Sequence, residues 1–273
     1  MSFKPWGRLT LQSGKPRMDS NVSSNILYYT PFENNEFMEL SLNMAGQIHL
    51  GKLYDVYTDS NFSGLSLSAP WLNSTTPAEA RVQDRGLWFH ASNGKLYLGT
   101  IYCSNNNFVK WQTRLTPTPY GTNNDLGVFN AYNRLSVTAT CRDLNAEWQF
   151  AGNGALRFAD NSNMFRINWV DGLGDVFCEG TYLTSVAGVL NAGPAAATVG
   201  VQLNADYPNL NLGTGTLEQS AMNHHFIGMS LRGTDYTNGN LGRNYWQAIE
   251  QSTAVPIGFF GNNFACLTAK LEL

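Results

Sequence analysis

Leu87-Trp-Phe-His-Ala-Ser-Asn-Gly-Lys-Leu-Tyr-Leu-Gly-Thr-Ile-Tyr102 is the stretch that most clearly indicates the fold of this chain. At its centre, Asn93-Gly94 is a dipeptide that favours tight hairpin turns, because both residues tolerate left-handed backbone conformations. The flanks, Leu87–Ala91 and Lys95–Tyr102, are rich in aromatic and β-branched side chains, which pair well across adjacent strands. The stretch therefore predicts an antiparallel β-hairpin.

Strand-like alternation of apolar and polar residues continues on both sides of the hairpin. The segments recur at intervals of roughly 8–12 residues and are separated by turn residues, which is typical of sandwiches and barrels. The clearest segments are Arg8–Gln12, Ile26–Thr30, Gln47–Tyr57, Gly64–Ala69, Arg134–Cys141, Met164–Val170, Val176–Leu183, Thr198–Leu203, Asn244–Glu250 and Phe264–Leu273. We therefore predict an all-β fold of antiparallel strands.

The composition agrees with a β fold that is rich in loops. The 273 residues include 30 Asn and 26 Gly, which suit tight turns, and only 14% of the residues are charged. Helical proteins are usually richer in Ala, Glu, Lys and Leu. We expect helices only at two short places, Pro77–Val82 and Phe108–Leu115.

A change of composition divides the chain into two series of strands. The segment Thr116–Asp125 reads Thr-Pro-Thr-Pro-Tyr-Gly-Thr-Asn-Asn-Asp, and its Pro and Asn residues oppose both helix and sheet. We therefore expect two tandem antiparallel β-sandwich or barrel-like domains with few short helices. The amino-terminal β domain is expected over residues 1–125 and the carboxyl-terminal β-sandwich domain over residues 126–273.

Charge and apolar runs restrict the partners that we expect. The net charge of −3 argues against nucleic acid, because phosphate recognition requires a basic surface. Residues 1–8 contain no apolar run, and no stretch of about 18 apolar residues occurs. We therefore expect no secretory signal and no membrane insertion, and synthesis in a cytoplasm.

The four cysteines do not form a recognisable motif. Cys103, Cys141, Cys178 and Cys266 lie far apart, whereas zinc and redox sites require closely spaced pairs. Within apolar segments a free cysteine behaves as a small hydrophobic residue. We expect buried free thiols, with a disulfide formed after release from the cell as the alternative.

Motifs for catalysis or cofactor binding are absent from the sequence. Gly64-Leu-Ser-Leu-Ser68 lacks the second glycine of a nucleophile elbow, and no phosphate-binding glycine loop occurs. His224 and His225 are adjacent, so on a strand they would point to opposite faces and could not easily share a metal. Asp160-Asn-Ser-Asn163 lacks the acids and the glycine of a calcium loop and is expected to form an Asn/Asp-rich turn. We predict no cofactor, no metal and no catalytic residue.

Paired carboxylates are the one catalytic alternative that we considered. Asp171, Asp175 and Glu179 could in principle act on a glycosidic bond, which requires two carboxylates facing one sugar ring. They surround the expected hairpin turn Asp171-Gly172, where aspartate commonly stabilises the turn itself. We therefore prefer the structural role for these acids.

Aromatic residues in loop-like segments are candidates for recognition. Aromatic faces beside amide groups bind sugars or proteins, although such residues also cover the base of a loop or form subunit contacts. The candidates are Trp71, Tyr120, Tyr207 and Tyr236. If the protein adsorbs to a host, we expect the carboxyl-terminal loops Tyr207–Leu217 and Gly233–Gly242 to do so.

Five short motifs follow one another through the first half of the chain. They are Arg8-Leu-Thr-Leu11 with Ser13-Gly14, Tyr28-Tyr-Thr-Pro-Phe32, Gly51-Lys-Leu-Tyr-Asp-Val56, Leu96-Tyr-Leu-Gly-Thr100 and Asn130-Ala-Tyr-Asn-Arg134. In this order they resemble a family of virion structural proteins from tailed bacteriophages. Looser similarity continues through Asn163–Gly172, Ala197–Asn204 and Tyr245–Glu250, while Phe129 stands where that family would have Trp.

The resemblance implies a non-enzymatic, β-rich component of the virion surface. Its role would be a short tail fibre, another tail appendage or a head-surface decoration protein, with host adsorption as one use. Its partners would be other virion proteins of the capsid or tail, and a host-surface glycan is a further candidate. Virion appendages are commonly trimeric, so we expect a homotrimer. The alternatives are a lectin-like carbohydrate-binding module and a glycan-cleaving enzyme.

Overall fold

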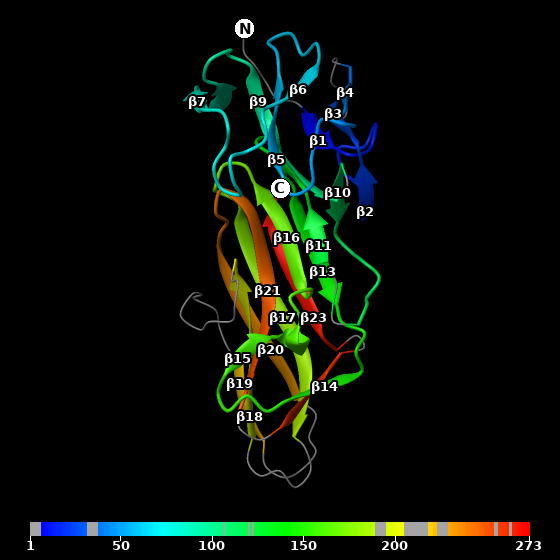
Figure 1. Ribbon diagram of the computed structural model, residues 1–273, viewed down its shortest axis with the longest axis vertical. Helices are drawn as coiled ribbons and strands as arrows, with labels where there is room; N and C mark the ends of the chain where they lie inside the picture. Colours follow the sequence, from blue (N-terminus) through cyan, green and yellow to red (C-terminus); the bar gives the residue numbers. More distant parts are fainter. Residues whose placement is uncertain are drawn as a thin grey trace.

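The computed structural model describes residues 7–31, 38–105, 107–119, 121, 123–188, 195–204, 218–222, 229–253, 256–261 and 264–273. Within these ranges almost all regular structure is β-strand, and the single helical element is the short 3₁₀ turn η1 (Ala159–Asn161). The predicted all-β class is confirmed. The molecule is elongated, with the amino-terminal strands at one end and the carboxyl-terminal half at the other (Figure 1).

Both expected helices are wrong. Residues 77–80 form a loop that leads into the strand β7 (Arg81–Asp84), and Phe108–Gln112 form the strand β10. In β10, Val109 and Trp111 are buried while Phe108 is exposed, so the side chains follow the two-residue period of a strand.

Three separate sheets are present among the described residues. The smallest has the order β1 (Gly7–Thr10), β3 (Ile26–Pro31) and β4 (Leu40–Asn43). The largest follows the path β19 (Glu218–Met222), β18 (Ala195–Leu203), β21 (Gly242–Ser252), β16 (Arg166–Asp171), β11 (Asn123–Leu126), β10, β9 (Leu96–Asn105), β5 (Leu53–Thr58) and β6 (Leu65–Leu67). Further strands attached to this path are β2 (Asn21–Ser24), β7, β8 (Leu87–His90), β12 (Val128–Asn130) and β15 (Leu156–Phe158).

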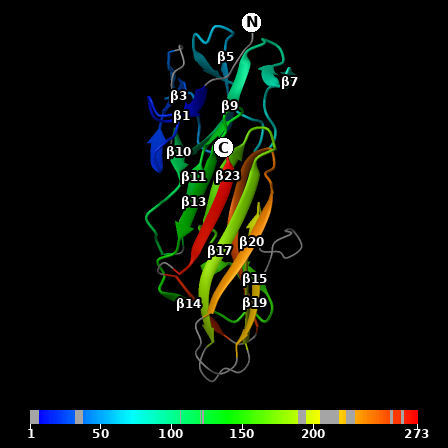
Figure 2. The same ribbon diagram turned by 180° about the vertical axis from the view of Figure 1, so that it is seen from behind.

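The third sheet covers one face of the carboxyl-terminal part of the large sheet. Its order is β13 (Ser136–Arg142), β23 (Cys266–Glu272), β17 (Phe177–Gly188), β22 (Ile257–Phe260) and β14 (Glu147–Phe150), with β20 (Met229–Asn238) paired to β17. Strands β16 and β21 lie in front in Figure 1, whereas β17 and β23 lie in front after a half turn in Figure 2. This part of the chain is therefore a two-layered sandwich.

Tryptophan side chains fill the space between the two layers. Trp169 on β16 and Trp246 on β21 are buried, with ring centroids 6.3 Å apart. Gly180 on β17 lies over the second ring, and a Cβ atom at this position would approach the Trp246 ring to 2.6 Å. The glycine thus allows the sheets to pack closely around the indole.

The expected boundary between residues 125 and 126 falls within strand β11. This strand pairs with β10 on one side and with β16 on the other, so hydrogen-bonded sheet continues from the first series of strands into the second. The pairing of β11 with β16 is parallel, unlike the antiparallel arrangement that we expected. The division into domains 1–125 and 126–273 stays a prediction.

The hairpin around Asn93-Gly94 is present, but its turn is wider than predicted. Strands β8 and β9 are antiparallel, and the main-chain N–H of His90 donates to the oxygen of Lys95 at 2.8 Å. Within the loop only Gly94 has a positive φ, while Asn93 Oδ1 accepts a hydrogen bond from the Lys95 N–H at 3.0 Å. This side-chain contact stabilises a four-residue loop in place of the expected two-residue turn.

The predicted burial of the cysteines is largely confirmed. All four are free thiols; Cys103, Cys141 and Cys178 are buried, and Cys266 is partly exposed. Among the described residues, no helix is both long enough and apolar enough to cross a bilayer.

Candidate functional site

The first and fifth sequence motifs contact each other through one asparagine. Asn130 Oδ1 accepts a hydrogen bond from the main-chain N–H of Leu9 at 2.7 Å, and its Nδ2 donates to the Leu9 oxygen at 3.4 Å. The Asn130 side-chain amide therefore forms hydrogen bonds with both the main-chain N–H and the main-chain oxygen of Leu9 on β1, as a neighbouring strand would. Asn133 adds a third contact, from its Nδ2 to the oxygen of Gly7 at 3.2 Å.

The third and fourth motifs meet at a buried carboxylate. Asp55 on β5 lies opposite Thr100 on β9, and its Oδ1 accepts hydrogen bonds from Thr100 Oγ1 at 2.8 Å and Trp71 Nε1 at 3.1 Å. Burial raises the pKa of Asp55, and the positive charge of Arg81, whose Nε lies 3.8 Å away, acts in the opposite direction. These motif residues are used for internal contacts.

A surface cleft, which we call the junction cleft, lies where the two halves of the chain meet. One wall is the β7–β8 hairpin, and the other is formed by the loops that follow β16 and precede β21. The cleft encloses about 470 Å³ and is lined by Pro77, Glu79, Ala80, Arg81, Trp88, Leu173 and Leu241. Such junctions are common places for ligand binding.

Strand register places the polar and aromatic groups of the hairpin on one face. Gln83 lies opposite Trp88, and Arg81 lies opposite His90, so all four side chains project to the same side. Arg81 Nη1 donates to the Gly172 oxygen at 2.7 Å, which ties the hairpin to the loop across the cleft. The cleft therefore joins segments that lie about 90 residues apart in the chain.

The junction cleft combines an aromatic surface with charged hydrogen-bonding groups. Glu79 Oε2 lies 2.9 Å from His90 Nε2, which holds the carboxylate at the rim. The Arg81 guanidinium lies 4.6 Å from the centre of the Tyr97 ring, which fixes it in place. Trp88 is partly exposed beside these groups. An aromatic face beside a carboxylate suits a hydroxyl-rich ligand, while the largely buried Arg81 shapes the floor of the cleft.

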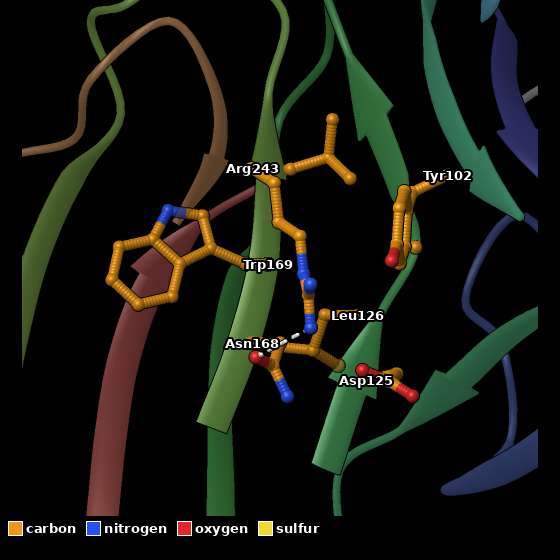
Figure 3. Close-up of a pocket in the computed structure, with 8 residues that line it drawn as sticks. Tyr102, Asp125, Leu126, Asn168, Trp169 and Arg243 are labelled. Atoms are coloured by element: carbon orange, nitrogen blue, oxygen red, sulfur yellow. Dashed lines mark hydrogen bonds between the residues drawn. The ribbon is translucent and has the colours of Figure 1, made fainter. Parts of the chain in front are cut away.

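A second groove, on the large sheet, is filled by its own side chains (Figure 3). The Arg243 guanidinium lies 4.9 Å from the centre of the Tyr102 ring, and its Nη2 donates to Asn168 Oδ1 at 3.1 Å. Burial raises the pKa of the nearby Asp125, and the positive charge of Arg243 opposes this. The remaining space is too small for a water molecule, so Arg243 joins strands here and does not form a ligand site.

The acids considered for glycoside hydrolysis each have a structural partner. Asp171 accepts hydrogen bonds from three main-chain N–H groups of the following loop, at 2.6 to 3.0 Å. Asp175 pairs with Arg134 at 2.8 Å, and Glu179 pairs with Lys270 at 3.2 Å. The expected hairpin at Asp171 is also wrong, because β16 and β17 belong to different sheets and the loop connects the two layers.

The aromatic candidates for recognition differ in their exposure to solvent. Trp71 is 2% exposed and serves the core, so it is not a recognition residue. Tyr236 is 66% exposed, but it lies on β20, which occupies much of the expected loop Gly233–Gly242. Residues that lie outside the described ranges are Tyr120, Tyr207, the loop Tyr207–Leu217, His224 and His225.

A buried acid that sequence reasoning missed lies inside the sandwich. Glu250 on β21 is fully buried and accepts hydrogen bonds from Arg157 Nε at 2.6 Å and Trp148 Nε1 at 2.9 Å. Burial raises its pKa to about 7, opposed by the charge of Arg157. These partners precede it by 93 and 102 residues, so no local pattern could indicate the site.

Metal binding finds no support in the described part of the chain. Within these residues, no group of three or more His, Cys, Asp or Glu side chains is placed to hold a metal ion. Asp160 of the expected Asn/Asp-rich turn lies in η1, where its carboxylate accepts a hydrogen bond from the Asn145 side chain.

Comparison with known proteins leaves the family open. No protein-family model and no curated protein matches the chain. Among solved structures, the functional form of the mosquito-larvicidal Cry4Aa toxin from Bacillus thuringiensis has 8% identity and a TM-score of 0.18, over 91% of this chain and 48% of the toxin chain. The D431N mutant VP2 protein of infectious bursal disease virus has 14% identity and a TM-score of 0.18, over 82% of this chain and 59% of that chain. The chain thus spans less than two thirds of each, and at these scores neither similarity bears on function.

Proposed function

We propose that this chain is a non-enzymatic structural component of a tailed-phage virion. The proposal combines the resemblance of the five ordered motifs with one structural observation: their residues contact one another. Leu9 is bonded to Asn130, and Asp55 is bonded to Thr100. Motif residues that are buried in mutual contacts support a scaffold role, whereas catalysis requires side chains that face a substrate.

The proposed location is the virion surface, as a short fibre, another tail appendage or a head decoration protein. An elongated all-β chain is suited to this role, because one end can attach to the particle while the other is displayed (Figure 1). A homotrimer is the oligomeric state that we propose, since closed symmetry covers exposed strand edges. Light scattering of the purified chain at micromolar concentration tests this state, and a monomeric mass would contradict it.

Antibody labelling of purified virions tests the proposed function. An antibody raised against the folded chain should label intact particles at regular positions, and particles that lack the gene should remain unlabelled. Label at the tail tip or baseplate would support adsorption, and label over the head would support decoration. Intact particles without label, from cultures that express the chain, would refute the virion assignment.

Carbohydrate binding is the second candidate function, and the junction cleft favours it. The partly exposed Trp88 ring can stack on a sugar, while the Glu79 carboxylate can bind its hydroxyl groups. Titration of the isolated chain with host-surface polysaccharide, followed by tryptophan fluorescence or calorimetry, measures the affinity. Trp88→Ala should abolish binding, whereas Phe108→Ala, an exposed aromatic outside the cleft, should retain it. Loss of binding in Tyr236→Ala instead would place the site on β20.

A further inference from the structure

A separate pocket lies between the loop after β1, the end of β10 and the start of β13. It encloses about 180 Å³, enough for several water molecules, and shares no lining residue with the junction cleft. Its walls include Arg8, Arg17, Trp111, Thr113, Ser136 and Thr138. We call it the arginine pocket.

Arg8 is the unusual member of this pocket because it is charged and almost completely buried. The residue is only 2% exposed. Its Nη1 donates to the Pro16 oxygen at 2.9 Å, and its Nη2 donates to the main-chain oxygen of Leu273 at 2.6 Å. The buried Nε has no hydrogen-bond partner. A guanidinium has five N–H donors, and burying a donor without a partner costs free energy. The Nε–H of Arg8 is therefore available to a further acceptor.

A second arginine adds positive charge to the same pocket. Burial, together with the nearby charge of Arg17, lowers the pKa of Arg8 to about 10. Within the described ranges, no carboxylate side chain forms an ion pair with Arg8 or Arg17. A terminal carboxylate at Leu273 would offset one of the two charges and leave the other.

We propose that the arginine pocket binds a tetrahedral oxyanion, the sulfate or phosphate group of a ligand. Planar guanidinium groups bind such oxygens through paired, charge-assisted hydrogen bonds. Ser136 and Thr138 also line the pocket, and their side chains carry hydroxyl groups that can act as further donors. The volume accommodates one such group, and an anion there would neutralise the paired arginines. This site does not depend on the virion assignment.

Calorimetric titration of the full chain with inorganic phosphate and with sulfate tests the site. The ionic strength is held constant with sodium chloride, because these anions also stabilise proteins nonspecifically. The wild-type chain should bind each anion saturably at one site. Arg17→Gln should weaken binding about tenfold, the effect of one charge-assisted hydrogen bond. Arg142→Gln, which removes an exposed arginine on β13 outside the pocket, should bind as the wild type does.

Two further measurements separate local binding from a general charge effect. Arg8→Lys retains the charge but loses the planar fork, so it should weaken binding while keeping the chain folded, as monitored by circular dichroism. Acetate should bind more weakly than phosphate, because it offers fewer oxygens and less charge. The proposal is overturned if no saturable binding occurs, or if Arg17→Gln and Arg142→Gln bind phosphate equally well.

Discussion

Glu250 makes the stability of the protein depend on pH, and Glu250→Gln should remove most of that dependence. The native pKa of about 7 lies above the ordinary value of 4.5 that applies to the unfolded chain. Between these values the native state retains the proton that the unfolded state has lost. The free energy of unfolding must therefore fall as pH rises from about 4.5 through 7.

The expected size of the effect follows from the two pKa values. Each pH unit between them corresponds to 1.36 kcal/mol, so the difference between 4.5 and about 7 amounts to about 3 kcal/mol. Glu250 is fully buried, which limits screening by solvent. This loss is a substantial fraction of the roughly 5–15 kcal/mol that is typical of the free energy of unfolding of native proteins.

Urea unfolding at pH 5, 6, 7 and 8, followed by tryptophan fluorescence, measures the effect. The wild-type free energy of unfolding should decline over this range, and the Glu250→Gln curve should decline by about 2.5 kcal/mol less, because the range starts half a pH unit above the unfolded pKa. Other buried acids such as Asp55 remain in both proteins, so their contributions cancel in the comparison. Glu272→Gln, on the exposed surface, controls for the loss of one negative charge. Parallel curves for the wild type and Glu250→Gln would refute the reasoning.

Three further substitutions test the contacts of the amino-terminal half, each by urea unfolding at pH 7. Asn130→Ala removes both hydrogen bonds to β1 and should lower the free energy of unfolding by about 2–3 kcal/mol. An effect below about 0.5 kcal/mol would contradict that role. Arg81→Met leaves Asp55 buried without its positive neighbour and should cost about 3–5 kcal/mol; an unchanged midpoint would show that the pair is dispensable. Gly99→Ala places a Cβ atom 2.0 Å from a main-chain oxygen and should cost about 1–3 kcal/mol, whereas Gly64→Ala, with nothing within 4 Å, should be neutral. Equal midpoints for the two glycine variants would contradict the steric account.

Much of the strand content could be predicted because burial follows the alternation of residue types. In Phe264–Leu273 the apolar side chains of Leu267, Ala269 and Leu271 are buried in β23, and the polar residues between them are more exposed. The hairpin around Asn93-Gly94 was predictable for a similar reason, since its signal is local. The width of the turn was not predicted, because it depends on the hydrogen bond from the Lys95 N–H to the Asn93 side chain.

Features that depend on distant contacts could not be predicted. The parallel pairing of β11 with β16 places Asn123 beside Arg166, although strands β12 to β15 lie between them in the sequence. The junction cleft brings Trp88 near Leu173 and Leu241, and nothing near Trp88 in the sequence indicates these neighbours. The expected helix at Phe108–Leu115 failed because a segment this short adopts the conformation that its sheet neighbours favour.

The continuous pairing of β10, β11 and β16 also has a mechanical consequence. These strands run roughly along the long axis of the molecule (Figure 1). A pull between the two ends would therefore load the four residue pairs of β11 with β16 together, in shear, and would not open them one after another. If a particle uses this chain to attach to a surface, we expect force to pass through paired strands at residue 125 and not through a flexible linker.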